Sequence, residues 1–299
     1  MKPKSLLGLL GITVSFVLAL ISMPRAEADT ILYGSTGNLN SNGGGRLYSI
    51  DVTMQSVTLI GNTGFDRLGA IAFNSSGVLY GASGGSVPGS TLLTIDPVTG
   101  MATVVGLISD RNIGVDGLRF DSQNNLYGAA WNGSTGVLVT IDPSNGNVLT
   151  SVTLMGSGNS FAPGIAFSSA GTLYASRGNA SGRTEDFDLL NRTTGQLTPI
   201  GPMDTVISDI AFAANGVLYG SSPDGMLYSI NPATGMKTAL FDTGIQNISG
   251  LATIVPEPSS FVLIALGSAL LLILVPWRAW TFNSKKLNER VGRFLGPFL

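Results

Sequence analysis

Residues 69–81 read Gly-Ala-Ile-Ala-Phe-Asn-Ser-Ser-Gly-Val-Leu-Tyr-Gly. Two apolar runs, 69–73 and 78–81, flank a turn of Asn, Ser and Gly, which is the pattern of two adjacent β-strands. The second run recurs as Leu-Tyr followed by Gly or Ala at residues 32–34, 126–128, 173–175 and 218–220. Successive copies lie 47, 47, 47 and 45 residues apart. That spacing is the length of four short strands with their turns, and it indicates the blades of a β-propeller.

The repeat also predicts how many blades the ring has. The first strand of the unit returns at residues 116–120, 163–167, 208–212 and 249–253. The repeat region starts on a second strand at 31–34 and ends just after a lone first strand at 249–253, so these two pieces add up to one blade. We therefore predict an all-β domain over residues 29–255, a five-bladed β-propeller closed by N- and C-terminal strands that share one blade. A ring of six or seven blades completed by another chain is the alternative.

The first 28 residues are typical of a secretory signal peptide. Lys2 and Lys4 form a positively charged start, and the residues from Leu6 to Met23 carry no charge. Ala26-Glu27-Ala28 then offers small residues at a cleavage site, as signal peptidase requires. We expect signal peptidase to remove residues 1–28 and the propeller to be exported. An uncleaved membrane anchor is the alternative.

A second apolar segment lies near the C-terminus. Residues 259–277 contain no charged side chain, and a stretch of about 20 such residues can cross a membrane as a helix. The tail 278–299 holds five basic residues and one acidic residue, an excess that predicts a cytoplasmic tail and an external propeller. Pro256, Glu257 and Pro258 stand directly before the predicted transmembrane helix.

A Pro-Glu-Pro motif at 256–258, a hydrophobic helix and a basic end, in this order, resemble the sorting signal of PEP-CTERM proteins of Gram-negative bacteria. The resemblance implies transient anchoring in the inner membrane, processing by an exosortase-type enzyme, and delivery to the cell surface or extracellular matrix. A plain C-terminal membrane anchor is the alternative. The repeat, with inner strands close to Gly-Ile-Ala-Phe followed by Gly-x-Leu-Tyr, is similar to bacterial propeller repeats, which implies the fold and no particular ligand.

The composition excludes several classes of function. The chain contains no histidine and no cysteine, so no Ser-His-Asp triad can form and no disulfide can stabilise the domain. Between Asp29 and Val255 there are 15 acidic and 8 basic residues, a net charge of −7 (8 − 15). Because nucleic-acid phosphates repel an acidic surface, DNA and RNA are not expected partners. We expect no catalytic residue, no bound metal and no cofactor, although the carboxylates leave calcium possible.

Five third strands end in an acidic or amide residue, which raises the possibility of a ring of calcium ligands. These residues are Asp51, Asp96, Asp142, Asn191 and Asn231. In four of the five units a glycine follows four residues later, so a turn in which the side chain binds its own backbone explains the residue type without a metal. The tyrosines of the Leu-Tyr pairs are expected to fill the spaces between neighbouring blades.

In the predicted topology, the longer loops gather at one end of the ring, where a binding site would form. Trp131, the only tryptophan of the domain, lies there beside Asn132. An exposed tryptophan next to an amide is typical of a sugar-binding surface; a tryptophan folded over a blade edge is the alternative. Arg177 and Arg183 lie close to acidic residues in an irregular loop and are further candidates, with solvated ion pairs as the alternative.

Three charged residues interrupt inner strands that are otherwise small or apolar. Asp116, Arg119 and Asp209 are expected to line the central channel; a buried pair that only fixes the register of the blades is the alternative. The candidates together favour a non-enzymatic propeller that binds an exopolysaccharide or a protein partner through its long-loop face. The alternative function is a calcium-dependent propeller enzyme, a glycan or lactone hydrolase or lyase, with carboxylates in the channel.

Overall fold

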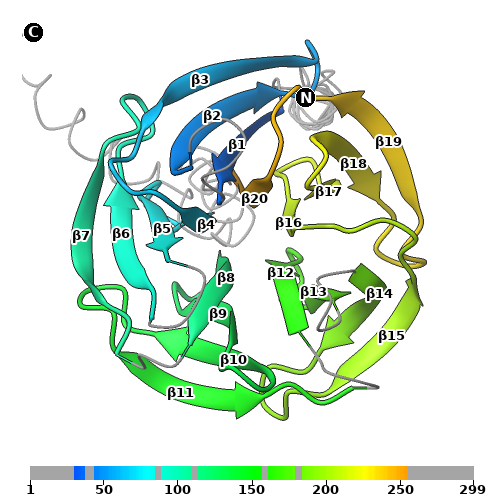
Figure 1. Ribbon diagram of the computed structural model, residues 1–299. Helices are drawn as coiled ribbons and strands as arrows, with labels where there is room; N and C mark the ends of the chain where they lie inside the picture. Colours follow the sequence, from blue (N-terminus) through cyan, green and yellow to red (C-terminus); the bar gives the residue numbers. More distant parts are fainter. Residues whose placement is uncertain are drawn as a thin grey trace, which may run out of the picture. The chain divides into compact units, whose positions relative to one another are not determined.

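The computed structural model describes residues 30–37, 44–84, 89–109, 113–156, 161–178 and 184–254. Within these ranges, twenty strands form five four-stranded antiparallel sheets, arranged as a ring (Figure 1). The all-β, five-bladed propeller predicted from the repeat is confirmed for this part of the chain. The chain divides after Val255 into two compact units, and all of the second unit lies outside the described residues.

In blades 2 to 5 the strands run outward from the axis in sequence order, whereas blade 1 has the last strand of the chain innermost. Blade 1 is β20 (Ile248–Thr253), β1 (Ile31–Thr36), β2 (Arg46–Asp51) and β3 (Ser56–Asn62). Blade 2 is β4 (Leu68–Phe73), β5 (Leu79–Ser83), β6 (Thr91–Ile95) and β7 (Ala102–Leu107), and blade 3 is β8 (Gly114–Phe120), β9 (Leu126–Trp131), β10 (Gly136–Ile141) and β11 (Val148–Thr153). Blade 4 is β12 (Phe161–Phe167), β13 (Leu173–Gly178), β14 (Thr184–Leu190) and β15 (Leu197–Pro202), and blade 5 is β16 (Asp209–Phe212), β17 (Leu218–Ser221), β18 (Met226–Ile230) and β19 (Lys237–Asp242).

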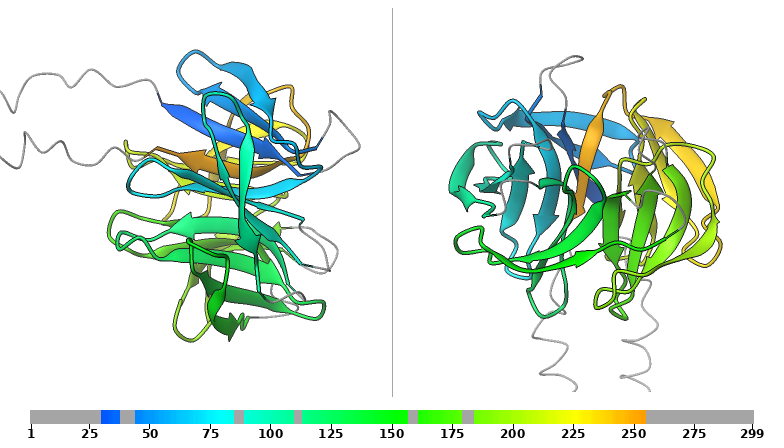
Figure 2. Two further views of the ribbon diagram at one scale, coloured as in Figure 1. Left: turned by 90° about the vertical axis from the view of Figure 1, so that its left-hand side faces the viewer. Right: turned by 60° about the horizontal axis from the view of Figure 1, so that its bottom comes forward.

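Blade 1 is built from both ends of the described chain. β20 pairs antiparallel with β1, with Leu32 opposite Thr253 and Tyr33 opposite Ala252, and both strands lie side by side in the views of Figure 2. The start of β1 and the end of β20 therefore lie at the same end of the ring. The described chain thus enters and leaves the propeller from one face.

The antiparallel pairing gives the ring two different ends. Turns between first and second strands and between third and fourth strands lie at one end, which we call the short-turn face; examples are residues 74–78 and 96–101. Loops between second and third strands and between blades lie at the other end, the long-loop face; examples are residues 63–67 and 132–135. Both ends of the described chain lie on the short-turn face.

Aromatic side chains join neighbouring blades. A tyrosine of each second strand meets the phenylalanine that ends the next inner strand, edge to face, at four junctions. The ring centroids are 5.0 Å apart for Tyr33 and Phe73, 5.2 Å for Tyr80 and Phe120, 5.3 Å for Tyr127 and Phe167, and 5.6 Å for Tyr174 and Phe212. At the fifth junction Thr253 replaces the phenylalanine, and its hydroxyl donates to the Phe212 carbonyl at 2.7 Å. The prediction that these tyrosines fill the spaces between blades is confirmed at the four aromatic junctions.

The residues that end the third strands form turns, as predicted. Each side-chain oxygen accepts a backbone N–H two or three residues later, at distances between 2.8 and 3.0 Å. The acceptors are Asp51, Asp96, Asp142, Asn191 and Asn231. The N–H group of Val98 holds the pKa of Asp96 below the usual value, and the hydroxyl and the N–H group of Ser144 do the same for Asp142. The turn chemistry accounts for the whole set.

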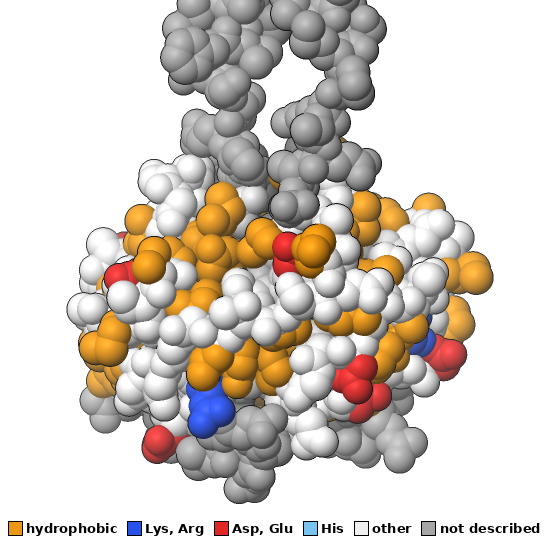
Figure 3. Space-filling view, turned by 90° about the horizontal axis from the view of Figure 1, so that it is seen from above, with side chains coloured by type: hydrophobic (Ala, Val, Ile, Leu, Met, Phe, Trp, Pro, Cys, Tyr) orange, Lys and Arg blue, Asp and Glu red, His pale blue; other side chains and the backbone are white. Residues whose placement is uncertain are grey.

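The outer strands form the rim of the ring and leave apolar side chains in water. Leu59 on β3, Val104 and Leu107 on β7 and Leu149 on β11 are all more than half exposed. Figure 3 shows one side of the ring, on which hydrophobic side chains are interspersed among backbone and other uncharged side chains, with a few charged ones. Single exposed apolar residues of this kind are normal for a soluble domain. No helix in the described ranges is long and apolar enough to cross a membrane.

Candidate functional site

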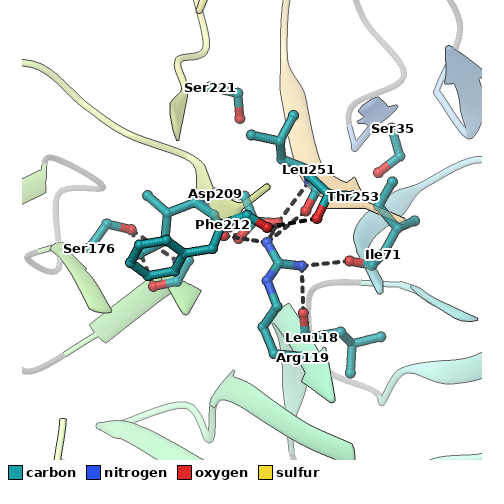
Figure 4. Close-up of polar contacts among 12 residues, drawn as sticks. Ser35, Ile71, Leu118, Arg119, Ser176, Asp209, Phe212, Ser221, Leu251 and Thr253 are labelled. Carbon is teal, nitrogen blue, oxygen red and sulfur yellow. Dashed lines mark hydrogen bonds and ion pairs between the residues drawn. The ribbon is translucent and has the colours of Figure 1, made fainter. Parts of the chain in front are cut away.

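The axis of the propeller is occupied by two charged residues from opposite sides of the ring. Arg119 on β8 stands where the other four inner strands have alanine, and Asp209 on β16 stands where they have glycine or alanine. The Arg119 side chain crosses the axis from blade 3 to blade 5, and its Nη2 lies 3.2 Å from Asp209 Oδ2 (Figure 4). The structure thus brings together two of the three predicted channel residues.

The guanidinium of Arg119 binds backbone carbonyls of four blades. Nη1 donates to the carbonyls of Ile71 and Leu118, both at 2.8 Å. Nη2 donates to the carbonyl of Leu251 at 2.6 Å and to that of Ile210. These four residues occupy the same position in their inner strands, on blades 2, 3, 1 and 5. Arg119 therefore ties the inner strands together at the centre of the ring.

Asp209 is fully buried, and its carboxylate accepts three hydrogen bonds. Its Oδ1 accepts the N–H of Ile210 at 2.8 Å, and its Oδ2 accepts the N–H of Leu251 at 2.8 Å and the Arg119 guanidinium. Burial raises the pKa of Asp209 to about 7, against the opposing effect of Arg119 and of the two N–H donors. The geometry therefore matches the alternative in which Arg119 and Asp209 form a buried pair, because both side chains bind backbone groups of the inner strands.

Asp116 lies nearer the long-loop end of the axis. It is partly exposed, and its Oδ1 would lie 3.9 Å from a Cβ added at Gly69 on the neighbouring blade. Burial raises the pKa of Asp116 to about 7, although Arg67 acts in the opposite direction. Within the described residues its carboxylate accepts no hydrogen bond, and no three acidic side chains there gather into a possible metal site.

A small cavity of about 80 Å³ opens at the short-turn end of the axis. Its floor is Arg119, and its walls are the ends of the inner strands. The lining residues are Ala72, Phe73, Phe120, Phe167, Ala211, Phe212, Ala252 and Thr253. The side chains that line the cavity are apolar apart from the guanidinium and the threonine hydroxyl, and a cavity of this volume is too small for a sugar ring. Arg119 thus separates this cavity from the Asp116 end.

Trp131 ends β9 on the long-loop face, at the junction of blades 3 and 4. It is half-buried and meets Phe161, the first residue of β12, with ring centroids 5.9 Å apart and an interplanar angle of 87°. The adjacent Asn132 caps its own loop, since its Oδ1 accepts the N–H groups of Ser134 at 3.0 Å and Thr135 at 2.9 Å. Phe161 is a neighbour that sequence reasoning did not nominate.

Arg177, a candidate for ligand contact with a solvated ion pair as the alternative, is 2% exposed on β13, so its ion pairs are buried and not solvated. Its Nε lies 3.1 Å from Asp188 Oδ2, and its Nη2 pairs with Asp186 on the same adjacent strand. Asp188 is fully buried, and its pKa is raised to about 6 by burial, with Arg177 opposing the rise. Sequence reasoning missed Asp188, although a charged residue between Phe187 and Leu189 was a usable signal. Arg183 lies outside the described residues.

The raised pKa values predict how stability depends on pH. Asp116 and Asp209 titrate at about 7 and Asp188 at about 6 in the folded protein, whereas unfolded aspartate titrates near 3.9. Between these values the folded state keeps protons that the unfolded state releases, so stability falls as pH rises from about 4 to about 7. We expect the melting temperature to be several degrees higher at about pH 5 than at about pH 8.

Thermal melting followed by circular dichroism at the two pH values checks this expectation. The Asp188→Asn variant is the control, because it removes one of the three titrating groups while keeping the side-chain volume. Its melting temperature should change less between the two pH values than that of the wild type. A melting temperature that rises with pH over this window would contradict the assignment of buried carboxyls with raised pKa values.

Comparisons with known proteins agree with the fold. A family model described as "Repeat of unknown function (DUF6923)" matches residues 156–250, and no curated protein matches the sequence. The nidogen–laminin complex structure is similar with a TM-score of 0.52 and 11% identity over 77% of this chain and 100% of that chain. A protein of unknown function from Bacteroides caccae matches with a TM-score of 0.44 and 14% identity over 71% of this chain and 72% of its own. A proposed 6-phosphogluconolactonase from Bacteroides fragilis matches with a TM-score of 0.46 and 10% identity, over 77% of this chain and 99% of its own. At these identities the similarity concerns the fold alone.

Proposed function

We propose that this chain is an exported, surface- or matrix-sorted propeller that binds an exopolysaccharide or a protein partner through its long-loop face without catalysing a reaction. The observation that carries the proposal is the Arg119–Asp209 pair on the axis. An acid or base in catalysis must come within hydrogen-bond distance of its substrate. Asp209 is fully buried and Arg119 nearly so, and both groups already bind the inner strands.

The position of the chain ends supports binding at the long-loop face. Thr30 and Ile254 are the limits of the first and last described segments, and both lie at the short-turn face. A propeller held by a segment that follows Ile254 would leave the opposite face free for a partner. Trp131 and Phe161 lie on the long-loop face and offer the aromatic surface that sugars and protein partners commonly contact.

The sorting route belongs to the same proposal. Residues 1–28, the Pro256-Glu257-Pro258 motif, the predicted helix 259–277 and the basic tail 278–299 all lie outside the described residues. Their patterns support cleavage by signal peptidase, transient insertion in the inner membrane of a Gram-negative bacterium and processing by an exosortase-type enzyme. Release of the propeller in a host with the exosortase, and its retention in a host that lacks it, would test this route.

Replacing Trp131 with alanine tests the binding surface. We expect retention on native exopolysaccharide to fall about tenfold, since loss of an aromatic contact of about 1.4 kcal/mol has that effect on affinity. Because Trp131 also packs on Phe161, a loss of about 1–2 kcal/mol in stability should accompany it. Co-sedimentation with the polysaccharide and thermal melting measure the two effects separately.

The matched control is Val98→Ala. Val98 is 81% exposed and belongs to a turn on the short-turn face, so its truncation removes apolar surface far from the proposed site. Its retention should equal that of the wild type. Equal retention by Trp131→Ala and the wild type would remove Trp131 from the binding surface.

The second candidate function is a calcium-dependent enzyme acting on a glycan or lactone. Asp116 favours it, because a partly exposed carboxyl with a pKa near 7 suits a general base at neutral pH. If the chain were such an enzyme, Asp116→Asn should abolish turnover while leaving binding intact. Turnover that survives this substitution would remove Asp116 from the catalytic role.

A further inference from the structure

We propose that the axis of the propeller is a cation-binding site and that the guanidinium of Arg119 is its resident cation. The site consists of oxygen atoms only. Four are backbone carbonyl oxygens, from Ile71, Leu118, Ile210 and Leu251, and the fifth is Oδ2 of Asp209. This inference does not depend on what the long-loop face binds.

The repeat itself creates the ring of acceptors. Each of the four carbonyls belongs to the second residue of the Gly-Ile-Ala-Phe segment, and each comes from a different blade. Because the blades are related by rotation about the axis, the same carbonyl of each inner strand reaches the same depth of the channel. Converging carbonyl oxygens are the ligands with which proteins replace the hydration shell of a cation. Carbonyl and carboxylate oxygens together are also what Ca²⁺ prefers.

Blade packing does not require an arginine at this place. The equivalent residues Ala72, Ala166, Ala211 and Ala252 are buried alanines. Arg119 therefore adds something other than volume, namely a permanent positive charge. That charge balances the carboxylate of Asp209 and satisfies carbonyls that would otherwise converge without donors. When Asp209 is ionised, above its pKa of about 7, the pair is neutral overall.

Removal of the guanidinium should therefore leave a vacant cation site. In Arg119→Ala the four carbonyls and Asp209 remain, with a net charge of −1 once Asp209 is ionised. The space left by the side chain adjoins the cavity of about 80 Å³ at the short-turn face, so a small ion can enter from solvent. The ligand class is a small cation that binds oxygen, and calcium, potassium and free guanidinium are the probes.

The experiment is thermal melting of the full chain, followed by circular dichroism of the β-sheet, for the wild type and Arg119→Ala. Each protein is melted in cation-poor buffer and with millimolar calcium chloride, potassium chloride or guanidinium chloride, and with urea at the same concentration as a solute control. We expect at least one cation to raise the melting temperature of Arg119→Ala by about 5 °C or more. The wild type, whose site is filled, should not respond.

Three further variants keep the test decisive. The double variant Arg119→Ala/Asp209→Ala lacks the carboxylate and should lose most of the response to cations. Arg119→Lys and Arg119→Met have similar length, but only lysine carries a charge, so the lysine variant should melt several degrees above the methionine variant. This comparison also serves if Arg119→Ala does not fold.

The proposal is overturned if Arg119→Ala melts at the same temperature in every salt. It is also overturned if the lysine variant is no more stable than the methionine variant, because Arg119 would then act through volume alone. A response of equal size in the wild type and the variant would show a general salt effect on the acidic surface and would likewise reject the axial site.

Discussion

Replacing Arg119 with alanine is expected to lower the free energy of unfolding by about 3–5 kcal/mol, because it leaves a buried carboxylate without its partner. Asp209 would keep the N–H donors of Ile210 and Leu251 but lose its opposite charge. Four carbonyls from four blades would lose their donor at the same time. Because the stability of a domain is only about 5–15 kcal/mol, this one side chain decides a large part of it.

Chemical denaturation of the wild type and the variant measures the difference. Arg192→Ala is the matched control, since Arg192 also pairs with a buried aspartate, Asp121, at 3.2 Å but is itself 46% exposed. Asp121 keeps the N–H groups of Gln123 and Asn125 when the arginine is removed, so the control should lose at most about 1 kcal/mol. If Arg119→Ala loses no more stability than Arg192→Ala, the axial pair is not the central tie of the ring.

Ending the chain after Asn247 is expected to prevent the propeller from folding. The truncation removes β20, and with it Ile248 and Leu251, which are 1% and 0% exposed. Burial of two such side chains stabilises a domain by about 3–6 kcal/mol, a large part of the usual total of about 5–15 kcal/mol. The truncation also removes the partner of β1, which would then present an unpaired edge beside the axis. Arg119 and Asp209 would each lose their contact with Leu251.

A chain that ends after Val255 is the control, because it keeps all of β20. We expect this control to melt cooperatively, with the circular dichroism of a β-protein, while the shorter chain remains unfolded or aggregates. Equal melting temperatures for the two chains would show that the β20–β1 pair does not hold the ring together.

The number of blades could be predicted because the same residue types recur where neighbouring blades pack together. Tyr80 must fill the space next to Phe120, and the same pair of residue types returns one repeat later at Tyr127 and Phe167. Gly81 is small because an added Cβ would lie 2.7 Å from Leu68 Cδ1. Packing requirements of this kind repeat the same residue types at regular spacing along the sequence, and that repeat is sufficient to identify the fold.

The site could be predicted only in part, because its contacts join residues far apart in the chain. Arg119 and Asp209 could be found one by one, since each replaces a small residue of the repeat. Their pairing requires blades 3 and 5 to be placed across the axis, which the spacing alone does not give. Arg177 was misjudged for a related reason: its burial depends on Asp188, which belongs to the next strand. The repeat gives no information about a residue pair that occurs once.

The most direct test of the account is to expose the full chain to a panel of bacterial glycans and lactones, with and without calcium, while recording binding and product formation together. We expect no product in either condition, and an exopolysaccharide that binds should do so with similar strength with and without calcium. Calcium-dependent conversion of a glycan or lactone that is lost in Asp116→Asn would contradict the proposed non-catalytic function, because Asp116 would then belong to a catalytic site near the axis.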